Sequence, residues 1–234
     1  MADFQEQAMG ITGLTIDNSS TTPSRAEFST FLNDGVMDVT RKSIQSDPAT
    51  ATQFQRESAI TDNNGFATNG AQILSVIREA EADGSSDGST AWEPCRRVPT
   101  HMQSRVVDPD SLSFASKYNP VYIIDNNGAL NVYPTPDNNN DGFTVFYVNN
   151  APEETDGSAL DHASTGIKYF PSDKVYLVIL YASIKSLEAA ASAKSLAQDV
   201  ELQQSYTTLA NSLKAEYNAA FQGAQQQQQG RPAR

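Results

Sequence analysis

The spacing of hydrophobic residues changes twice along the chain, and this change constrains the fold more than any other feature. Apolar residues recur every three or four positions from Phe28 to Val39 and again after Pro171, which predicts helices with one buried face at each end. Between residues 51 and 149, short alternating or β-branched runs are separated by Gly, Pro, Asn and Asp, which predicts antiparallel strands and turns. We therefore expect an α+β fold, with a helical bundle from the N-terminal and C-terminal helices and a β-rich antiparallel insertion between them.

The first predicted helix has clear start and stop signals. Ser24 and Glu27 form the S-x-x-E pattern of a capping box, in which each side chain accepts a hydrogen bond from the other residue's backbone N–H. We expect the helix to reach about Ile44, because Asp47 and Pro48 then disfavour helical geometry.

The strongest strand signal in the middle of the chain is a hairpin. Residues 121–124 and 129–133 flank residues 125–128, an Asp-Asn-Asn-Gly sequence that tolerates the positive φ of a tight turn. Residues 143–148 supply a further strand, and residues 83–90 are too rich in Gly, Ser and Asp to pack, so we expect an exposed loop there.

The C-terminal helical region begins at Pro171–Asp173, where the residue types are those of a helix start. Its apolar face continues to Leu187 and an Ala-rich run, and a second periodic segment extends from 202 to 221. Asp199 would suit the start of a second helix, but one bent helix fits the same pattern.

These patterns together predict the domain organisation. Residues 1–22 form an extended N-terminal arm, 23–47 and 171–222 the helical bundle, 50–150 the β-rich domain, 151–170 a surface connecting loop, and 223–234 a disordered Gln-rich tail. The tail is predicted to be disordered because it is of low complexity and contains no apolar anchor.

The chain is acidic, with a formal net charge of -12 and a sequence pI of about 4.5. Tight binding of nucleic acid through its phosphates needs clustered Lys and Arg, so we do not expect a DNA-binding protein. An acidic wall would instead suit a conduit through which DNA passes without adhering. Arg96, Arg97 and Arg105 form a dense basic group, which we interpret first as an ion-pairing or subunit-contact surface and second as a DNA contact.

The sequence favours neither secretion nor a membrane span. The single cysteine, Cys95, excludes an intrachain disulfide and is compatible with a reducing cytoplasm. Residues 1–10 lack a basic region followed by an apolar run, so no secretory signal is expected. The longest apolar run, 175–184, has about half of the roughly 20 residues that a membrane span needs, and we interpret it as a buried helix face.

Residues of the types that enzymes use most often are sparse. His101 and His162 are the two histidines, and no G-x-S-x-G, G-x-x-x-x-G-K-[ST], G-x-G-x-x-G or H-E-x-x-H motif occurs. Cys95 is interpreted as a structural thiol, although the neighbouring arginines could lower its pKa. The acids in 153–156 lie in a Gly- and Pro-bounded loop, which is typical of a solvated face. We therefore expect no catalytic residue, no cofactor and no enzymatic activity.

One segment resembles part of a calcium-binding loop. Asp137, Asn139, Asp141 and Gly142 match the first half of the pattern D-x-[DN]-x-[DN]-G. The complete loop would need a carboxylate at its twelfth position, which is Val148 here. We therefore prefer an Asn- and Asp-rich hairpin turn and expect no metal site.

Three stretches of sequence, taken with the order of the predicted elements, carry a resemblance to a known family. They are residues 28–44 (FSTFLNDGVMDVTRKSI), 117–136 (KYNPVYIIDNNGALNVYPTP) with 143–148, and 170–187 (FPSDKVYLVILYASIKSL). With the last helix, the pattern covers most of residues 24–222 and resembles the head-to-tail adaptor (neck) proteins of tailed bacteriophages.

The resemblance implies a structural virion protein, made in the host cytoplasm, that forms a ring of twelve copies between the portal and the tail. DNA would meet the chain only in passing through the channel, and no membrane would be involved. Tail or tail-completion proteins would bind the other side of the ring. The C-terminal tail would contact the portal, through residues Gln225, Gln226, Gln227, Gln228, Gln229, Arg231 and Arg234, although the poly-Gln run departs from the family pattern.

Two alternatives share the sequence features described above. A tail completion, tail-tube or collar protein would be equally acidic and would equally lack an active site. An enzyme with an unrecognised carboxylate site is the second alternative, and it would turn over a glycan or a peptide.

Overall fold

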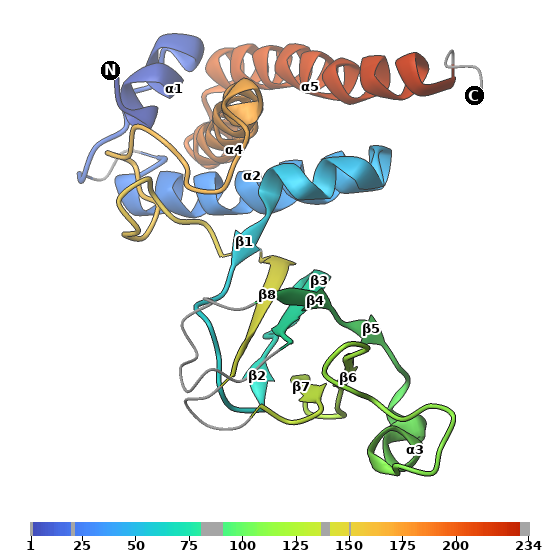
Figure 1. Ribbon diagram of the computed structural model, residues 1–234. Coiled ribbons are helices and arrows are strands. Elements are labelled where there is room, and N and C mark those ends of the chain that lie inside the picture. Colours follow the sequence, from blue (N-terminus) through green and yellow to red (C-terminus); the bar gives the residue numbers. More distant parts are fainter. Residues whose placement is uncertain (1, 20–21, 81–90, 137–140, 150, 230–234) are drawn as a thin grey trace. The chain divides into compact units, whose positions relative to one another are not determined.

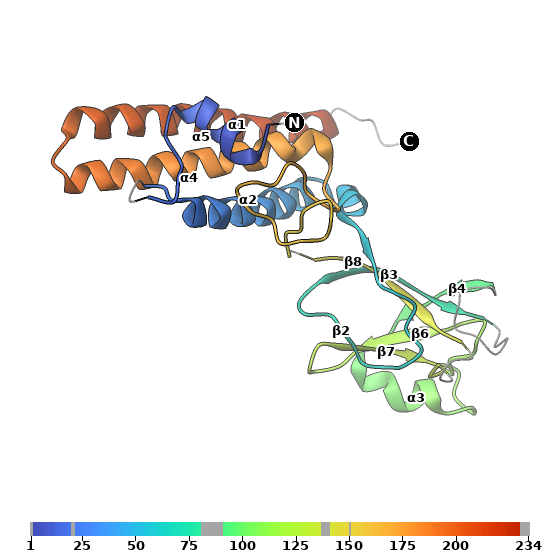
Figure 2. The same cartoon turned by 90° about the vertical axis from the view of Figure 1, so that its left-hand side faces the viewer.

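The structure is a computed structural model that describes residues 2–19, 22–80, 91–136, 141–149 and 151–229, with side-chain surroundings up to residue 221. Helices at both ends and sheets in the middle confirm the predicted α+β class. The chain divides into two compact units (Figures 1 and 2): unit 1 contains residues 1–54 and 150–234, and unit 2 contains residues 55–149. Unit 1 is therefore built from both ends of the sequence.

The described part of unit 1 consists of helices and connecting segments. The helices are α1 (Phe4–Thr12), α2 (Arg25–Ser46), α4 (Val175–Leu196) and α5 (Val200–Gln229), with short 3-10 turns η1 (Pro48–Phe54) and η3 (Ser172–Lys174). Helix α4 contacts α1, α2 and α5 and forms the centre of the unit. The predicted capping box at the start of α2 is present, because Ser24 N–H donates to the Glu27 carboxylate at 2.8 Å and Glu27 N–H donates to Ser24 Oγ at 3.3 Å.

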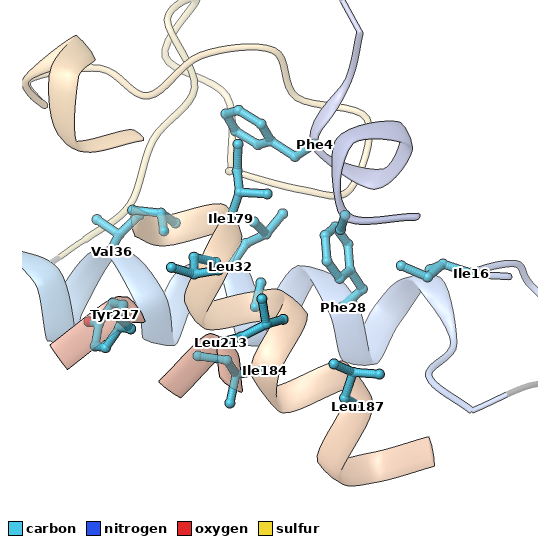
Figure 3. Close-up of a cluster of buried hydrophobic side chains, with 14 of the residues drawn as sticks. Phe4, Ile16, Phe28, Leu32, Val36, Ile179, Ile184, Leu187, Leu213 and Tyr217 are labelled. Carbon is cyan, nitrogen blue, oxygen red and sulfur yellow. The ribbon is translucent and has the colours of Figure 1, made fainter. Parts of the chain in front are cut away.

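The hydrophobic core of unit 1 lies between α2, α4 and α5 (Figure 3). Phe28 and Leu32 of α2 and Leu187 of α4 are each 0% exposed, and burial of such a side chain contributes about 1.5–3 kcal/mol. Helices α2 and α4 approach closely at Gly35, since a Cβ atom there would lie 3.1 Å from Tyr181 Cδ1 and 3.2 Å from the Val178 carbonyl oxygen. The absence of a side chain at position 35 lets the two helices pack closely.

Residues 172–196 form a helix that is long and apolar enough to span a membrane by length and composition. Half of its most apolar 18-residue stretch is buried inside the protein, where α1, α2 and α5 pack against the helix. This is the environment of a core helix, and the helix is longer than the run 175–184 alone indicated.

The prediction of an extended arm at residues 1–22 is wrong for residues 4–12, which form α1. Asp3 caps this helix by accepting a 2.7 Å hydrogen bond from Glu6 N–H, and Gly13 ends it at φ 68°. Phe4 and Ala8, one turn apart, are buried in the core. The helix is stabilised by this packing, which its short sequence does not reveal.

The segment 151–170 is more than a surface connection. Leu160 and Ile167 are buried in the core of unit 1, and Phe4 N–H donates to the Ser164 carbonyl oxygen at 3.0 Å. The segment therefore holds α1 in place. Leu160 and Ile167 are seven residues apart and mostly polar residues lie between them, so they formed no periodic signal.

The C-terminal region contains two helices, which settles the choice between one bent helix and two. Helix α4 ends at Leu196, Gln198 has a φ of 60°, and Asp199 begins α5 by accepting a hydrogen bond from Leu202 N–H at 3.4 Å. The two helices form an antiparallel hairpin (Figure 2). We call residues 196–202 the hairpin tip.

The prediction of a disordered tail from residue 223 is wrong for 223–229, because α5 continues to Gln229. Gln is a good helix former, and neither Gly nor Pro occurs between 224 and 229. Residues 230–234 lie outside the described part of the chain.

Unit 2 contains two four-stranded sheets. The first has the order β1 (Arg56–Glu57), β8 (Phe143–Val148), β3 (Gln72–Glu79), β4 (Trp92–Pro94), and the second has the order β2 (Phe66–Ala67), β7 (Ala129–Tyr133), β6 (Val121–Ile124), β5 (Arg96–Arg97). The predicted hairpin of residues 121–133 is confirmed as β6 and β7, with Val121 opposite Tyr133. The pairing of β5 with β6 is parallel, which departs from the expected antiparallel insertion.

Side chains of both sheets share one apolar cluster, to which β3, β8, β6 and β7 contribute Val76, Val145, Tyr122 and Leu130. Val121 and Ile123 belong to a second cluster with Val98 and Val106. Since alternate residues of a strand point to opposite faces, β6 is buried on both faces. The second cluster is completed by the 3-10 turn η2 (Thr100–Met102), helix α3 (Gln103–Val107) and the segment that follows it.

Candidate interaction surfaces

The basic group predicted from the sequence lies on the surface of unit 2. Arg96 and Arg97 form β5, an edge strand of the second sheet, and both are exposed, as is Arg105 on α3. Within the described residues, none of the three guanidinium groups forms an ion pair with a carboxylate. Their charges are therefore available for a partner, although neighbouring residues of a strand point to opposite faces.

An apolar patch, which the sequence pattern did not predict, lies beside this basic group. We define the α3 surface as Arg105, Val107, Leu112, Phe114 and Tyr118. Leu112 and Tyr118 are 109% and 68% exposed. Exposed apolar side chains gathered in this way are typical of protein-binding surfaces.

Backbone hydrogen bonds fix the loop that presents the α3 surface. Ala115 N–H donates to the Val106 carbonyl oxygen at 3.0 Å, and Phe114 N–H donates to the Ser111 carbonyl oxygen at 3.0 Å. Arg96 N–H bonds the Pro120 carbonyl oxygen at 2.9 Å, which brings β5 close to the same loop. The patch therefore belongs to an ordered loop, held by the buried side chains beneath it.

The hairpin tip in unit 1 is a second exposed apolar patch. Leu196, Val200 and Leu202 are 88%, 57% and 40% exposed. Asp199 and Glu201 lie between them, so the tip is acidic as well as apolar. The periodicity of residues 202–221 predicted a buried position for Leu202, because periodicity alone does not show where a helix extends beyond its partners.

An open groove follows the seam between α4 and α5 near the hairpin tip. It has a volume of about 720 Å³, and its walls include Ala191, Ala210 and Asn211. The charged residues in it are paired, since Lys214 Nζ lies 2.6 Å from Glu188 Oε1. Burial acts to raise the pKa of Glu188, but hydrogen bonds from Lys214 and Lys185 outweigh it and hold this pKa below its ordinary value. The charges of Glu188 and Lys214 in the groove thus neutralise each other.

The thiol of Cys95 is in its unreactive, protonated form. Burial raises the pKa of Cys95 to about 12, and the nearby Arg78 guanidinium opposes this shift only in part. The adjacent Arg96 and Arg97 are exposed and do not activate the thiol, contrary to the possibility that the sequence left open. Cys95 packs at the edge of the cluster between the two sheets, as a structural thiol does.

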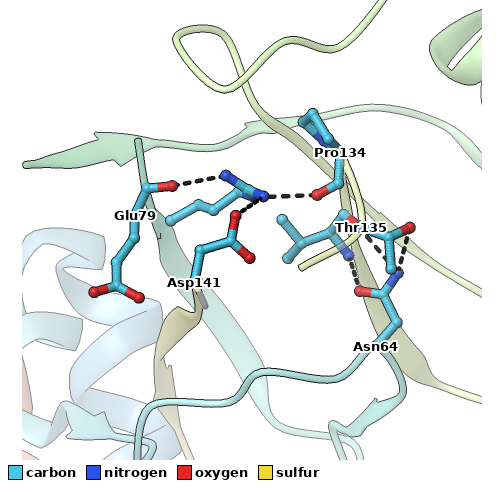
Figure 4. Close-up of polar contacts among 7 residues, drawn as sticks. Asn64, Glu79, Pro134, Thr135 and Asp141 are labelled. Atoms are coloured by element: carbon cyan, nitrogen blue, oxygen red, sulfur yellow. Dashed lines mark hydrogen bonds and ion pairs between the residues drawn. The ribbon is translucent and has the colours of Figure 1, made fainter. Parts of the chain in front are cut away.

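The turn that resembles a calcium loop contributes an ion pair to unit 2 (Figure 4). Asp141 is 1% exposed, and its Oδ2 atom lies 2.6 Å from Arg78 Nη2. Arg78 also donates to the carbonyl oxygens of Glu79 and Pro134, at 2.7 and 3.1 Å. Asp141 is therefore a structural anion, while Asp137 and Asn139 lie outside the described residues.

The acids of residues 153–161 hold their own loop together. Glu154 accepts hydrogen bonds from Ser164 Oγ and Thr165 N–H at 2.8 and 3.2 Å, and Asp161 accepts one from Ala163 N–H at 2.8 Å. The hydrogen bond from Ser158 N–H lowers the pKa of Asp156. The carboxylate of Asp161 is thus directed to its own turn, and His162 is anchored by its backbone N–H to Ser29 Oγ at 3.0 Å.

Five of the residues predicted to contact the portal lie at the end of α5. Gln225 to Gln229 belong to its last turns, whereas Arg231 and Arg234 lie outside the described residues. Among the described residues, no three His, Cys, Asp or Glu side chains are grouped as a metal site would require.

The two exposed apolar patches are typical of the class of proteins that work through contacts with other proteins. The model of the SU10 adaptor protein family matches residues 3–234. The chain belongs to this family of phage head-tail adaptors, and it is a structural component of the head-tail junction. No curated protein matches the sequence.

Proposed function

We propose that copies of this chain assemble into an adaptor ring that links the portal to the tail and forms part of the DNA conduit. The observation that carries this proposal is the family match, which extends over residues 3–234 and so includes both units. A ring of twelve copies is the expected stoichiometry. The chain would be made in the host cytoplasm and would function in the virion neck.

The charge of the chain supports a role as a conduit wall. The net charge of -12 opposes lasting contact with DNA phosphates, so DNA would pass without being retained. The described residues of unit 1 are mainly helical, which suits a rigid wall element, whereas unit 2 carries exposed apolar side chains suited to a protein partner.

The portal contact is proposed for the C-terminal end of α5. Gln225, Gln226, Gln227, Gln228 and Gln229 would meet the portal as a helix end, followed by Arg231 and Arg234. The β-rich unit 2 would then face tail or tail-completion proteins. Arg96, Arg97 and Arg105 would serve contacts between subunits.

Negative-stain imaging of the protein alone and mixed with portal rings tests this proposal. We expect a ring of twelve copies seated on the portal face that meets the tail. A tail-tube, collar or tail-completion protein would leave the portal bare and would instead bind a tail structure. Labelling of the protein in intact virions at any site other than the head-tail vertex would contradict the adaptor function.

A further inference from the structure

We propose that the hairpin tip of one copy binds the α3 surface of the next copy, so that one heterologous contact repeats around the assembly. This inference specifies the subunit contact of the proposed adaptor ring and rests on that proposed function.

The first argument is the location of the exposed apolar side chains. Ten large hydrophobic side chains of the described residues are exposed, and seven of them belong to these two patches. They are Val107, Leu112, Phe114 and Tyr118 on the α3 surface and Leu196, Val200 and Leu202 at the tip. Scattered exposed hydrophobics need no explanation, but two concentrated patches on one chain indicate surfaces that become buried in an assembly.

The second argument is charge complementarity. Residues 96–121 carry four cationic side chains and two carboxylates, a formal charge of +2 in a chain whose total is -12. Residues 196–202 carry two carboxylates and no Lys or Arg, a formal charge of -2. Opposite charges around two apolar patches favour and orient their association, whereas contact of either patch with itself would bring like charges together.

The composition of the α3 surface favours a protein partner over DNA. A surface that grips phosphates needs clustered cations, but Asp108 and Asp110 lie in the same loop as Leu112. An aromatic and an arginine beside an exposed aliphatic residue match the centre of a protein interface. The acidic, apolar tip of another copy has the matching chemistry.

A contact between two different patches has a consequence for assembly. Each copy offers one tip and one α3 surface, so copies join head to tail and close into a ring when the rotation per copy allows it. A self-complementary contact would stop at a dimer.

Charge-reversal complementation tests the contact. In Arg105→Glu the α3 surface gains a carboxylate, and in Glu201→Arg the tip gains a cation; Asp199 is left unchanged because it caps α5. Glu57→Lys is the matched control, since it alters the net charge as Glu201→Arg does but at an exposed position of β1 outside both patches. Circular dichroism confirms that each variant is folded.

Self-association is measured by sedimentation velocity over a concentration series, with the chain alone and with portal rings. We expect each patch variant alone to associate about tenfold more weakly than the unchanged chain. An equimolar mixture of the two should recover the association, because the reversed α3 surface then meets the reversed tip. The control should associate as the unchanged chain does.

The inference is overturned if either patch variant associates like the unchanged chain, or if the mixture is no stronger than its components. It is also overturned if the unchanged chain remains monomeric both alone and with portal. Portal binding by the unchanged chain reports separately on the proposed function. Complementation without portal binding would refute the adaptor function but support the contact. Portal binding without complementation would refute the contact but support the adaptor function.

Discussion

The hydroxyl of Tyr217 donates a 2.6 Å hydrogen bond to Oδ2 of Asp38 and thereby joins α5 to α2 across 179 residues of sequence. Lys42 Nζ lies 2.8 Å from the same carboxylate oxygen and 4.6 Å from the centre of the Tyr217 ring. Tyr217 itself is 4% exposed. The bond therefore lies at the border of the core, partly shielded from water.

We predict that Tyr217→Phe lowers the free energy of unfolding by about 1.5–3 kcal/mol, the range for a hydrogen bond to a charged group. The ring and its packing are retained, so the loss reports on the hydroxyl alone. Urea denaturation followed by circular dichroism measures it. Tyr176→Phe is the control, because its 2.8 Å bond to Glu216 is exposed and its loss should cost less. Equal losses in the two variants would contradict the prediction.

Stability should fall at alkaline pH. Burial and the hydrogen bond to Asp38 raise the pKa of Tyr217, and burial likewise raises the pKa of Tyr181. Above the ordinary tyrosine pKa of about 10, the unfolded chain releases protons that the folded chain keeps, so the free energy of unfolding decreases as pH rises.

For one such tyrosine, the free energy of unfolding decreases with a slope that approaches about 1.4 kcal/mol per pH unit. Urea titrations between pH 9 and about pH 11 measure the slope, since the ordinary tyrosine pKa of about 10 lies inside this window. Tyr217→Phe should flatten it relative to the unchanged chain. An unchanged slope in this variant would show that Tyr217 does not contribute.

Removal of Arg78 should strongly destabilise unit 2. Arg78→Met leaves the buried carboxylate of Asp141 without its cation and frees two carbonyl oxygens, for an expected loss of about 3–5 kcal/mol. Lys214→Met is the matched control, because it breaks the ion pair between Lys214 and Glu188, whose side chains are 44% and 35% exposed. Its loss should lower the free energy of unfolding by at most about 1 kcal/mol. Denaturant unfolding compares the two. Losses of similar size would show that burial of the Arg78 pair is unimportant.

Two glycines in helices should respond in opposite ways to replacement by alanine. Gly35→Ala places a Cβ atom 3.1 Å from Tyr181 Cδ1 and 3.2 Å from the Val178 carbonyl oxygen, and forced overpacking costs about 1–3 kcal/mol. Gly10→Ala in α1 meets no atom within 4 Å and should stabilise by up to about 1 kcal/mol through helix propensity. Thermal unfolding of both variants measures the difference, and a stabilised Gly35→Ala variant would show that α2 and α4 can separate at little cost.

Deletion of residues 224–234 should leave the subunit folded and weaken its attachment to portal. The described core residues of unit 1 end at Phe221, so the deletion leaves all of them in the chain. Co-sedimentation with portal rings measures attachment, and circular dichroism checks the fold. Unchanged binding by the folded, truncated protein would contradict the proposed portal contact.

The features that the sequence predicted well are those whose partners are close in the chain. The Ser24–Glu27 capping box and the turn of 125–128 are each complete within four residues, so their patterns carry the whole signal. Both were confirmed, as was the α+β class that follows from the change in hydrophobic spacing.

The features that the sequence missed depend on distant partners. Helix α1 is held by the core and by Ser164, 160 residues further along the chain, and the Arg78–Asp141 pair spans 63 residues. The two exposed apolar patches were missed for the same reason. Exposure of Leu112 and of Leu202 follows from where the neighbouring elements stop, which periodicity does not report.

Because unit 1 is made from both ends of the sequence, its synthesis imposes an order of folding. The apolar stripe of α2 leaves the ribosome more than 130 residues before α4 begins, a delay on the order of ten seconds at typical rates. All of unit 2 emerges in that interval and can fold while Phe28 and Leu32 still lack their partner helix. During synthesis, α2 thus exposes its apolar stripe while unit 2 is already folded. Unit 1 can complete its core only after α4 and α5 have been synthesised.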